Sequence, residues 1–213
     1  MPNRKVIIAG ATGLVGREIL AGLLADPAVT AVHSLGRRAP TVQHSKLTAH
    51  VVDFLALSAL PRADEVYLAL GTTIKVAGSQ AAFRAVDFDA NLAVAKAALA
   101  AGAKRAGLVS AMGADAGSKI FYSRVKGELE EALSDLPFEG LVMARPSMLV
   151  GNREDLGQPV RRGEIWAAAL GKVVGFLIPA NYRPIAALAV AKALLSSVPI
   201  ATGRTVLLSG SMR

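Results

Sequence analysis

The stretch KVIIAGATGLVG, residues 5–16, indicates the fold of this 213-residue chain. Its first half, Lys5–Ala9, is a run of aliphatic and β-branched residues that predicts a strand. Three glycines follow, and Leu14–Ala25 then repeats apolar residues at helical spacing. A strand, a glycine-rich turn and a helix in immediate succession are the context in which such a turn binds a dinucleotide.

Each glycine of this turn has its own task in that interpretation. Gly10 permits the tight turn, Gly13 lets the backbone approach a pyrophosphate, and Gly16 lets the helix pack closely on the strand. The N-terminus of the helix adds free N–H groups and a positive dipole end, which favour phosphate. A turn with a purely structural role is the alternative. The residues predicted to contact the cofactor here are Gly10, Thr12, Gly13, Leu14, Val15 and Gly16.

Short β-branched runs alternate with longer Ala- and Leu-rich stretches along the rest of the chain. This alternation predicts right-handed βαβ units, and therefore an α/β Rossmann fold with a doubly wound parallel sheet. We expect a single domain over residues 1–213, in which residues 146–185 form a small substrate-side region or lid. After the first strand and helix, strands are predicted at residues 31–35, 49–52, 65–69, 107–110, 140–144 and 205–208, and helices at 82–101, 122–134, 161–175 and 185–197.

The composition excludes several classes of protein. With 53% hydrophobic and 19% charged residues, the chain is globular and not disordered. It has no cysteine, which excludes disulfides and thiolate metal sites, and its three histidines lack metal-ligand spacing, so we expect no metal. The net charge is +8, but the basic residues form scattered pairs without interleaved aromatics, so we expect no nucleic-acid partner. No signal-peptide layout or membrane span is apparent, and we expect a cytoplasmic protein.

The end of the second predicted strand indicates which dinucleotide is bound. NAD enzymes usually place an acidic residue there, whereas this chain has Arg37 and Arg38, whose guanidinium groups suit the 2′-phosphate of NADP. We therefore expect NADPH or NADP as the cofactor, with solvated surface arginines as the alternative. Two later strand ends are predicted to contribute cofactor contacts, although a capping aspartate and a plain turn are the alternatives there: Asp53 and Phe54, and Leu70, Gly71 and Thr72.

Three residues form a candidate catalytic set. Tyr122 and Lys126 are four residues apart on a predicted helix and therefore share a face. An ammonium beside a phenol helps it to transfer a proton, so this tyrosine could protonate a carbonyl oxygen while hydride reaches the carbon. Ser110, at the end of the preceding strand, could hold the same oxygen. A helix face with a buried lysine stem is the alternative.

These motifs together resemble the short-chain dehydrogenase/reductase (SDR) superfamily, and the G-x-x-G-x-x-G spacing resembles its atypical branch. Further stretches are similar to the Tat-interacting-protein-like NAD(P)-binding oxidoreductases, and the resemblance extends from Lys5 to about Ser209. Those stretches are Leu70–Thr73, Val86–Asp89, Val109–Asp115, Tyr122–Glu128 and Arg145–Pro146.

The resemblance implies an NADPH-binding Rossmann fold with a Ser/Tyr/Lys site on Ser110, Tyr122 and Lys126. Lys126 would also hold the nicotinamide ribose, and Arg145 and Pro146 would line the nicotinamide end. The expected activity is reduction of a small carbonyl substrate by hydride transfer, performed by a monomer or homodimer.

Two other functions stay open at this point. The family includes regulators, so an NADPH-binding sensor with little or no turnover is the first. The wider superfamily usually has a catalytic asparagine, and whether Asp87 or Asn91 replaces it is open. Nucleotide-sugar or flavin chemistry on the same fold is the other function, because a fold does not determine a reaction.

Overall fold

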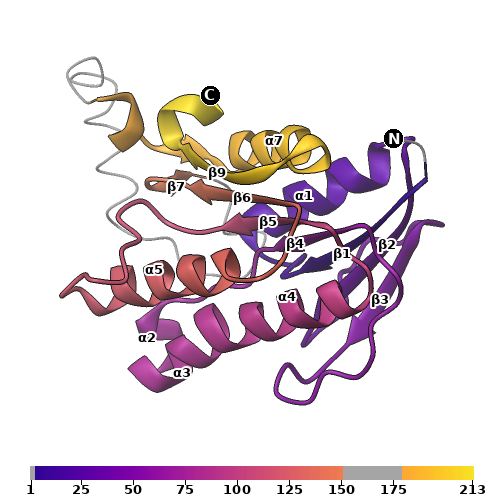
Figure 1. Cartoon of the computed structure of the whole chain (residues 1–213), viewed down its shortest axis with the longest axis horizontal. Helices are drawn as coiled ribbons and strands as arrows, with labels where there is room; N and C mark the ends of the chain where they lie inside the picture. The colour runs from indigo at the N-terminus through magenta and orange to yellow at the C-terminus, as the bar shows by residue number, and fades with distance from the viewer. Residues whose placement is uncertain (1–2, 151–178) are drawn as a thin grey trace.

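A seven-stranded parallel sheet forms the centre of the molecule (Figure 1). The computed structural model describes residues 3–150 and 179–213. The strands lie in the order β3–β2–β1–β4–β5–β6–β9, and each neighbouring pair is parallel. The order reverses between β1 and β4, where open α/β sheets have the crevice that binds ligands. The strands are β1 (Arg4–Ala9), β2 (Val29–Gly36), β3 (Leu47–Val51), β4 (Glu65–Leu68), β5 (Arg105–Val109), β6 (Gly140–Arg145) and β9 (Gly203–Leu208).

Two layers of helices cover the sheet, one on each face (Figure 1). α1 (Leu14–Ala25) and α7 (Ala187–Ser197) pack on one face, and α4 (Asn91–Ala100) and α5 (Phe121–Ser134) pack on the other. This arrangement confirms the predicted doubly wound α/β fold. Within the part of the chain that the structure describes, no helix is long and apolar enough to cross a membrane.

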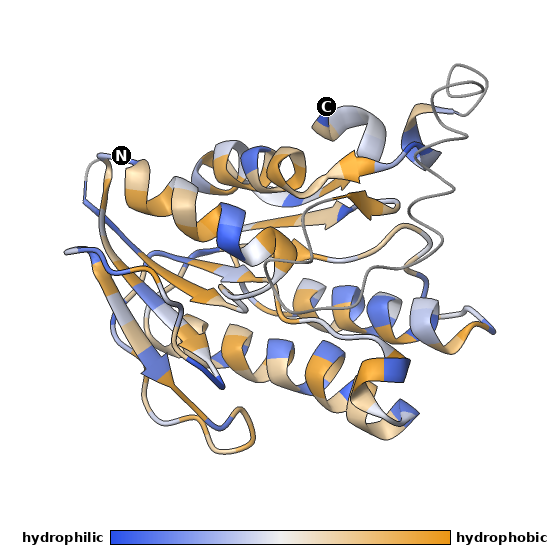
Figure 2. Ribbon diagram, turned by 180° about the vertical axis from the view of Figure 1, so that it is seen from behind, coloured by the Kyte–Doolittle hydropathy of each residue, from blue (hydrophilic) through white to orange (hydrophobic). Residues whose placement is uncertain are grey.

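β1 shows why these residues form a central strand. Val6 and Ile8 belong to the core beneath α1 and α7, whereas Ile7 and Ala9 belong to the core beneath α4 and α5, because successive side chains alternate between faces. All four side chains are fully buried. A strand that is buried on both faces has a continuous apolar sequence, and the central strands in Figure 2 are coloured largely as hydrophobic.

The helix predicted at residues 82–101 is divided into three parts. α3 (Gln80–Arg84) is followed by a π-helical segment, η1 (Ala85–Ala90), and only then by α4. The prediction of one continuous α-helix was therefore wrong in its middle, because a local widening of the helix leaves the apolar periodicity on either side intact.

The C-terminal part also differs from the prediction. The helix expected at residues 185–197 begins two residues later, because Ile185–Ala186 forms strand β8 and pairs with β7 (Leu149–Val150). The helix predicted at residues 161–175 and most of the expected lid lie outside the described residues. The remaining short elements are α2 (Ile74–Ala77), η3 (Ala180–Tyr182), η4 (Val198–Ile200) and η5 (Ser209–Met212).

A histidine pair at one edge of the sheet gives the stability a pH dependence. His33 Nδ1 on β2 lies 3.1 Å from His50 Nε2 on β3. Burial, followed by the nearby charges of His50 and Lys5, lowers the pKa of His33 below its ordinary value of 6.5. Between pH 6.5 and the lower pKa of the folded state, His33 binds a proton more readily in the unfolded chain than in the folded one. The free energy of unfolding should therefore fall as the pH drops from 6.5 through the folded pKa.

Urea unfolding between about pH 5 and pH 7.5 measures this effect. His33→Asn should weaken the loss of stability at low pH, whereas the control His44→Asn, at an exposed position, should retain it. Equal losses in the two variants would contradict the assignment to His33.

Candidate functional site

The glycine turn after β1 has a geometry that only glycine satisfies. Gly10 has a φ of +87°, and a Cβ there would lie 2.5 Å from the carbonyl oxygen of Ala69 on the neighbouring strand. A Cβ on Gly16 would overlap the carbonyl of Gly10. Gly13 precedes α1 without a side-chain cap, so the first N–H groups of the helix are available to an anion.

A cavity of about 500 Å³ opens beside this turn. Its walls come from the glycine turn, from the ends of β2, β3 and β4, and from η1. Nine of the residues predicted to bind the cofactor line it together: Gly10, Thr12, Gly13, Arg37, Arg38, Asp53, Phe54, Leu70 and Gly71. The cavity is also lined by residues that were not predicted from the sequence, and these include Ser34, Leu55, Ala85, Val86 and Ala90.

Four predicted cofactor residues support the cavity from behind. Leu14 and Val15 pack into the core beneath α1, and Gly16 is buried against Gly10. The backbone N–H of Thr72 donates to Asp87 Oδ2 at 2.8 Å. These residues shape the turn and the adjoining loop, and do not themselves line the cavity.

The arginine end of the cavity follows from the turn after β2. A Cβ on Gly36 would lie 2.9 Å from the carbonyl oxygen of Arg38, so glycine permits the close turn that carries Arg37 and Arg38. Both arginines are exposed and line the cavity. Opposite them, Asp53 Oδ1 accepts a hydrogen bond from the Leu55 N–H at 2.9 Å, which is the capping role considered as its alternative.

Tyr122 and Lys126 lie on one face of α5, as predicted, but in different surroundings. The Tyr122 ring is partly exposed and packs against Phe83, with ring centroids 5.5 Å apart. Lys126 is only 4% exposed, and its Nζ lies 2.7 Å from Asp87 Oδ1 in η1. The tyrosine is thus the accessible member of the pair and the lysine the fixed one.

Ser110 has a different partner from the one expected. Its hydroxyl donates to Glu130 Oε1 at 2.5 Å, and both residues are buried. A serine hydroxyl has a single proton to donate. Glu130 is also eight residues beyond Tyr122, about 12 Å along the helix. The Ser110 hydroxyl is therefore bonded to Glu130, one helical turn beyond Lys126, and its catalytic role stays a prediction.

Arg145 and Pro146 also lie away from the cavity wall. Arg145 binds Glu130 through its Nε, 3.1 Å from each carboxylate oxygen, and through its NH2, 2.6 Å from Oε2. These hydrogen bonds raise the pKa of Arg145, which stays charged. The carbonyl of Pro146 accepts a hydrogen bond from the Met112 N–H at 2.8 Å. Both residues fasten the end of β6 to its neighbours.

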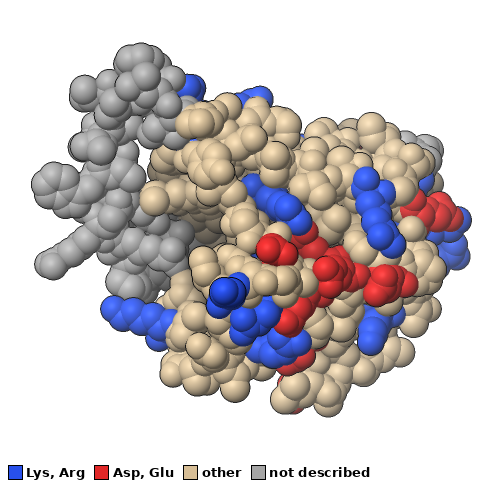
Figure 3. All heavy atoms as spheres, turned by 60° about the vertical axis from the view of Figure 1, so that its left-hand side comes forward, with Lys and Arg blue, Asp and Glu red and all other residues tan. Residues whose placement is uncertain are grey.

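Ion pairs neutralise much of the charge around α5. Glu128 contacts both Arg84 and Arg124, in addition to the pair formed by Glu130. On the face shown in Figure 3, basic and acidic side chains of the described residues adjoin one another. The positive net charge of the chain is therefore not gathered into one continuous basic surface on this face.

Comparison with known proteins gives the same picture of the fold and of the cofactor class. The family model described as NAD(P)H-binding matches residues 10–136. Protein fmp52, mitochondrial, of Emericella nidulans is 39% identical over 178 residues, which cover 79% of this chain and 76% of the relative. FMP52 of Candida albicans is 40% identical over 156 residues, which cover 70% and 68%. Because these relatives are named as mitochondrial proteins, the predicted cytoplasmic location is contradicted.

Solved structures share the architecture at low sequence identity. An oxidoreductase of the short-chain dehydrogenase/reductase family from Burkholderia thailandensis superposes with a TM-score of 0.67 at 19% identity, covering 100% of this chain and 94% of its own. A UDP-N-acetylglucosamine 4-epimerase from Methanobrevibacter ruminantium M1 gives a TM-score of 0.71 at 16% identity, covering 98% and 77%. These likenesses show the Rossmann fold. The matched family model and the FMP52 relatives confirm the predicted membership of an NAD(P)-binding family.

Proposed function

The chain belongs to the NAD(P)H-binding family of SDR-type Rossmann proteins, and from this premise we propose that it is an NADPH-dependent oxidoreductase that reduces a carbonyl group of a small substrate. The observation that carries the proposal is the cavity beside the glycine turn, which has two arginines at one end. On the adjoining α5, an accessible tyrosine stands one turn from a buried lysine.

The residues around the cavity fit a dinucleotide. The cradle at Gly10 and Gly16 would be filled by any Cβ, and the α1 N-terminus directs N–H groups toward the turn. Arg37 and Arg38 supply guanidinium groups where a 2′-phosphate would lie. When bound, NADPH supplies the hydride.

Tyr122 and Lys126 divide the remaining work. In this proposal the Tyr122 hydroxyl gives its proton to the carbonyl oxygen of the substrate, which is general acid catalysis. The Lys126 ammonium stabilises the negative charge that this transfer leaves on the tyrosine oxygen, and its position behind Gly71 suits a ribose hydroxyl.

Removing both arginines should abolish the preference for NADPH, so that NADPH and NADH bind with similar affinity. A charged hydrogen bond contributes about 1.5–3 kcal/mol, so Arg37→Ala/Arg38→Ala should weaken NADPH binding about 10–100-fold. NADH lacks the 2′-phosphate, so its affinity should hardly change. Fluorescence titration with each cofactor measures both dissociation constants.

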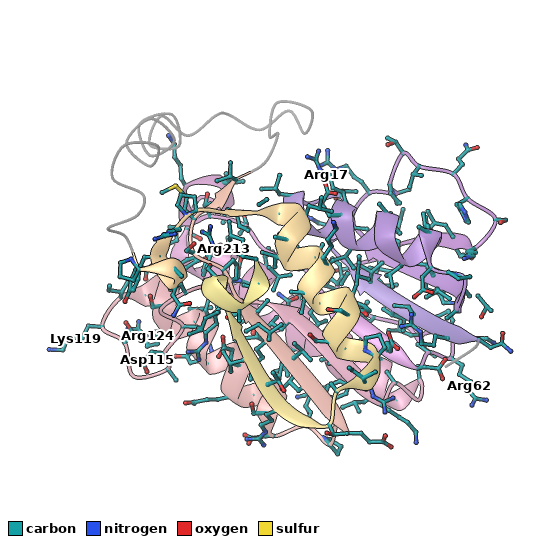
Figure 4. The ribbon with its side chains drawn as sticks, turned by 90° about the horizontal axis from the view of Figure 1, so that it is seen from above. Arg17, Arg62, Asp115, Lys119, Arg124 and Arg213 are labelled. Carbon is teal, nitrogen blue, oxygen red and sulfur yellow. The ribbon has the colours of Figure 1, made fainter. Side chains whose placement is uncertain are left out.

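The matched control for this double variant is Arg62→Ala. Arg62 is exposed, and in Figure 4 its side chain points away from the body of the molecule. This variant should bind both cofactors as the parent protein does. An equal loss of NADPH and NADH affinity in the double variant would contradict a 2′-phosphate contact.

The experiment that tests the function measures cofactor binding first and substrate turnover second. Purified protein is titrated with NADPH and NADH, and oxidation of NADPH is then followed across a panel of aldehydes, ketones and quinones. Tight NADPH binding with turnover of a carbonyl substrate is expected. The absence of dinucleotide binding would overturn the proposal.

A second candidate function is an NADPH-binding regulator with little or no turnover. The observation that favours it is the bond from Ser110 to Glu130, which uses the hydroxyl proton that a carbonyl substrate would need. Tight NADPH binding without oxidation by any member of the panel would select this function instead.

A further inference from the structure

A buried carboxylate lies directly behind the cavity wall, on the π-helical segment η1. Asp87 is 0% exposed, although an ionised carboxylate is costly to bury without partners. The π-helical turn widens the helix at this point, and such turns occur frequently at functional sites. The carboxylate therefore needs an explanation beyond the packing of the helix.

Asp87 joins three parts of the site. One carboxylate oxygen, Oδ1, lies 2.7 Å from Lys126 Nζ on α5, and the other, Oδ2, accepts the Thr72 N–H at 2.8 Å. One turn later, Asn91 Nδ2 donates to the carbonyl of Leu70 at 3.1 Å and to that of Asp87 at 3.1 Å. The loop after β4, the segment η1 and the helix α5 are thus fastened at a single point.

Gly71 places this ion pair against the cavity. A Cβ built on Gly71 would lie 3.6 Å from Asp87 Oδ1 and 4.0 Å from Lys126 Nζ. Gly71 itself lines the cavity, so the ion pair lies next to a residue of the cavity wall. A lysine side chain rotates about several bonds, and burial of the pair to 5% and 1% side-chain exposure restricts Lys126 to one conformation.

We propose that Asp87 is a positioning residue, which holds the Lys126 ammonium behind Gly71 where it meets the bound cofactor and supports Tyr122. The kinetic part of this inference rests on the proposed reductase function, whereas the part that concerns NADPH binding does not require turnover. Asp87 acts through Lys126, so its contribution should disappear when Lys126 is absent.

A double-mutant cycle on NADPH affinity tests that dependence. The dissociation constant is measured by NADPH fluorescence for the parent protein, Asp87→Asn, Lys126→Met and the variant with both changes. Residues in contact couple by enough free energy to change a constant about tenfold. Asp87→Asn should therefore weaken binding about tenfold in the parent protein, and should have little further effect in the Lys126→Met background.

Two outcomes of the cycle would overturn the proposal. A loss by the same factor in both backgrounds would mean that Asp87 fastens η1 to the Thr72 loop independently of Lys126, and would overturn the proposal. No loss in either background would overturn it as well. If no carbonyl substrate is turned over, the reductase proposal fails, while the affinity cycle still decides the role of Asp87.

Controls separate positioning from damage to the fold. Asp89→Asn removes an exposed carboxylate from the same segment and should leave NADPH affinity unchanged. Thermal unfolding shows which variants fold. If Asp87→Asn does not fold, Asp87→Glu replaces it in the cycle, because glutamate keeps the charge but displaces the carboxylate by one methylene group. The same coupling with Lys126→Met is then expected, and its absence would overturn the proposal.

Discussion

Replacement of Tyr122 by phenylalanine should lower kcat by a factor of about 10²–10⁴ and leave the dissociation constant of NADPH nearly unchanged. The substitution removes only the hydroxyl group that would protonate the substrate. The ring keeps its contact with Phe83, at 5.5 Å between centroids, so the start of α5 should keep its position. Steady-state oxidation of NADPH with the best substrate of the panel measures the change.

Tyr67→Phe is the control for the loss of a tyrosine hydroxyl. Tyr67 is fully buried in β4, and its hydroxyl lies 3.2 Å from Glu65 Oε2, outside the cavity. This variant should lose some stability and keep its turnover. If Tyr122→Phe reduced the substrate as fast as the parent protein, another group would have to donate the proton.

Glu65→Gln should lower the free energy of unfolding by about 1.5–3 kcal/mol, because the buried Arg4 guanidinium loses its charged hydrogen bonds to Glu65 and keeps Asp26 as its acidic partner. Arg4 NH1 lies 2.8 Å from both carboxylate oxygens of Glu65, and the two residues are 8% and 2% exposed. Burial alone would lower the pKa of Arg4, but the hydrogen bond and charge of Glu65, together with Tyr67 and Asp26, outweigh it and raise that pKa. Urea unfolding measures the loss.

A surface ion pair provides the comparison for Glu65. Lys104 Nζ lies 2.8 Å from Glu139 Oε1, and both side chains are largely exposed. Glu139→Gln should leave the stability unchanged within error, because exposed pairs are screened by solvent. A double replacement, Arg4→Met/Glu65→Leu, should recover part of the stability that Glu65→Gln loses, because both buried charges are removed together and Asp26, which also loses its partner, is partly exposed. A Glu65→Gln variant as stable as the parent protein would show that the buried pair contributes nothing.

The sequence predicted the sheet and the glycine turn beside the cavity because both depend on local rules. A strand buried on two faces must be continuously apolar, and a turn that no Cβ can enter must be glycine, as at Gly10. The position of Arg37 and Arg38 at the cavity was predictable for a similar reason, since they directly follow β2, whose carboxyl end lies at the ligand-binding edge of the sheet. In each case a few neighbouring residues are enough to determine the local structure.

The catalytic side depended on contacts between distant segments, and there the prediction was incomplete. Ser110 follows Leu108 by two positions, so strand alternation alone directs it toward the helix layer that contains α5. What no local pattern states is that Glu130, two turns beyond Tyr122, would accept its hydrogen bond. The widened turn that brings Asp87 to Lys126 was equally hidden, because the flanking residues keep an ordinary helical period.

In the parallel sheet, a buried ion pair that stabilises the fold and the ligand-binding turn lie at opposite ends of the same strand. β1 has six residues and spans about 20 Å, with the Arg4–Glu65 pair at its start and the glycine turn at its end. Substitutions at the first edge change how well the protein survives heat or denaturant, and those at the second change which molecules it handles. Substitutions at the start of β1 should therefore change thermal stability without changing which ligand the glycine turn binds.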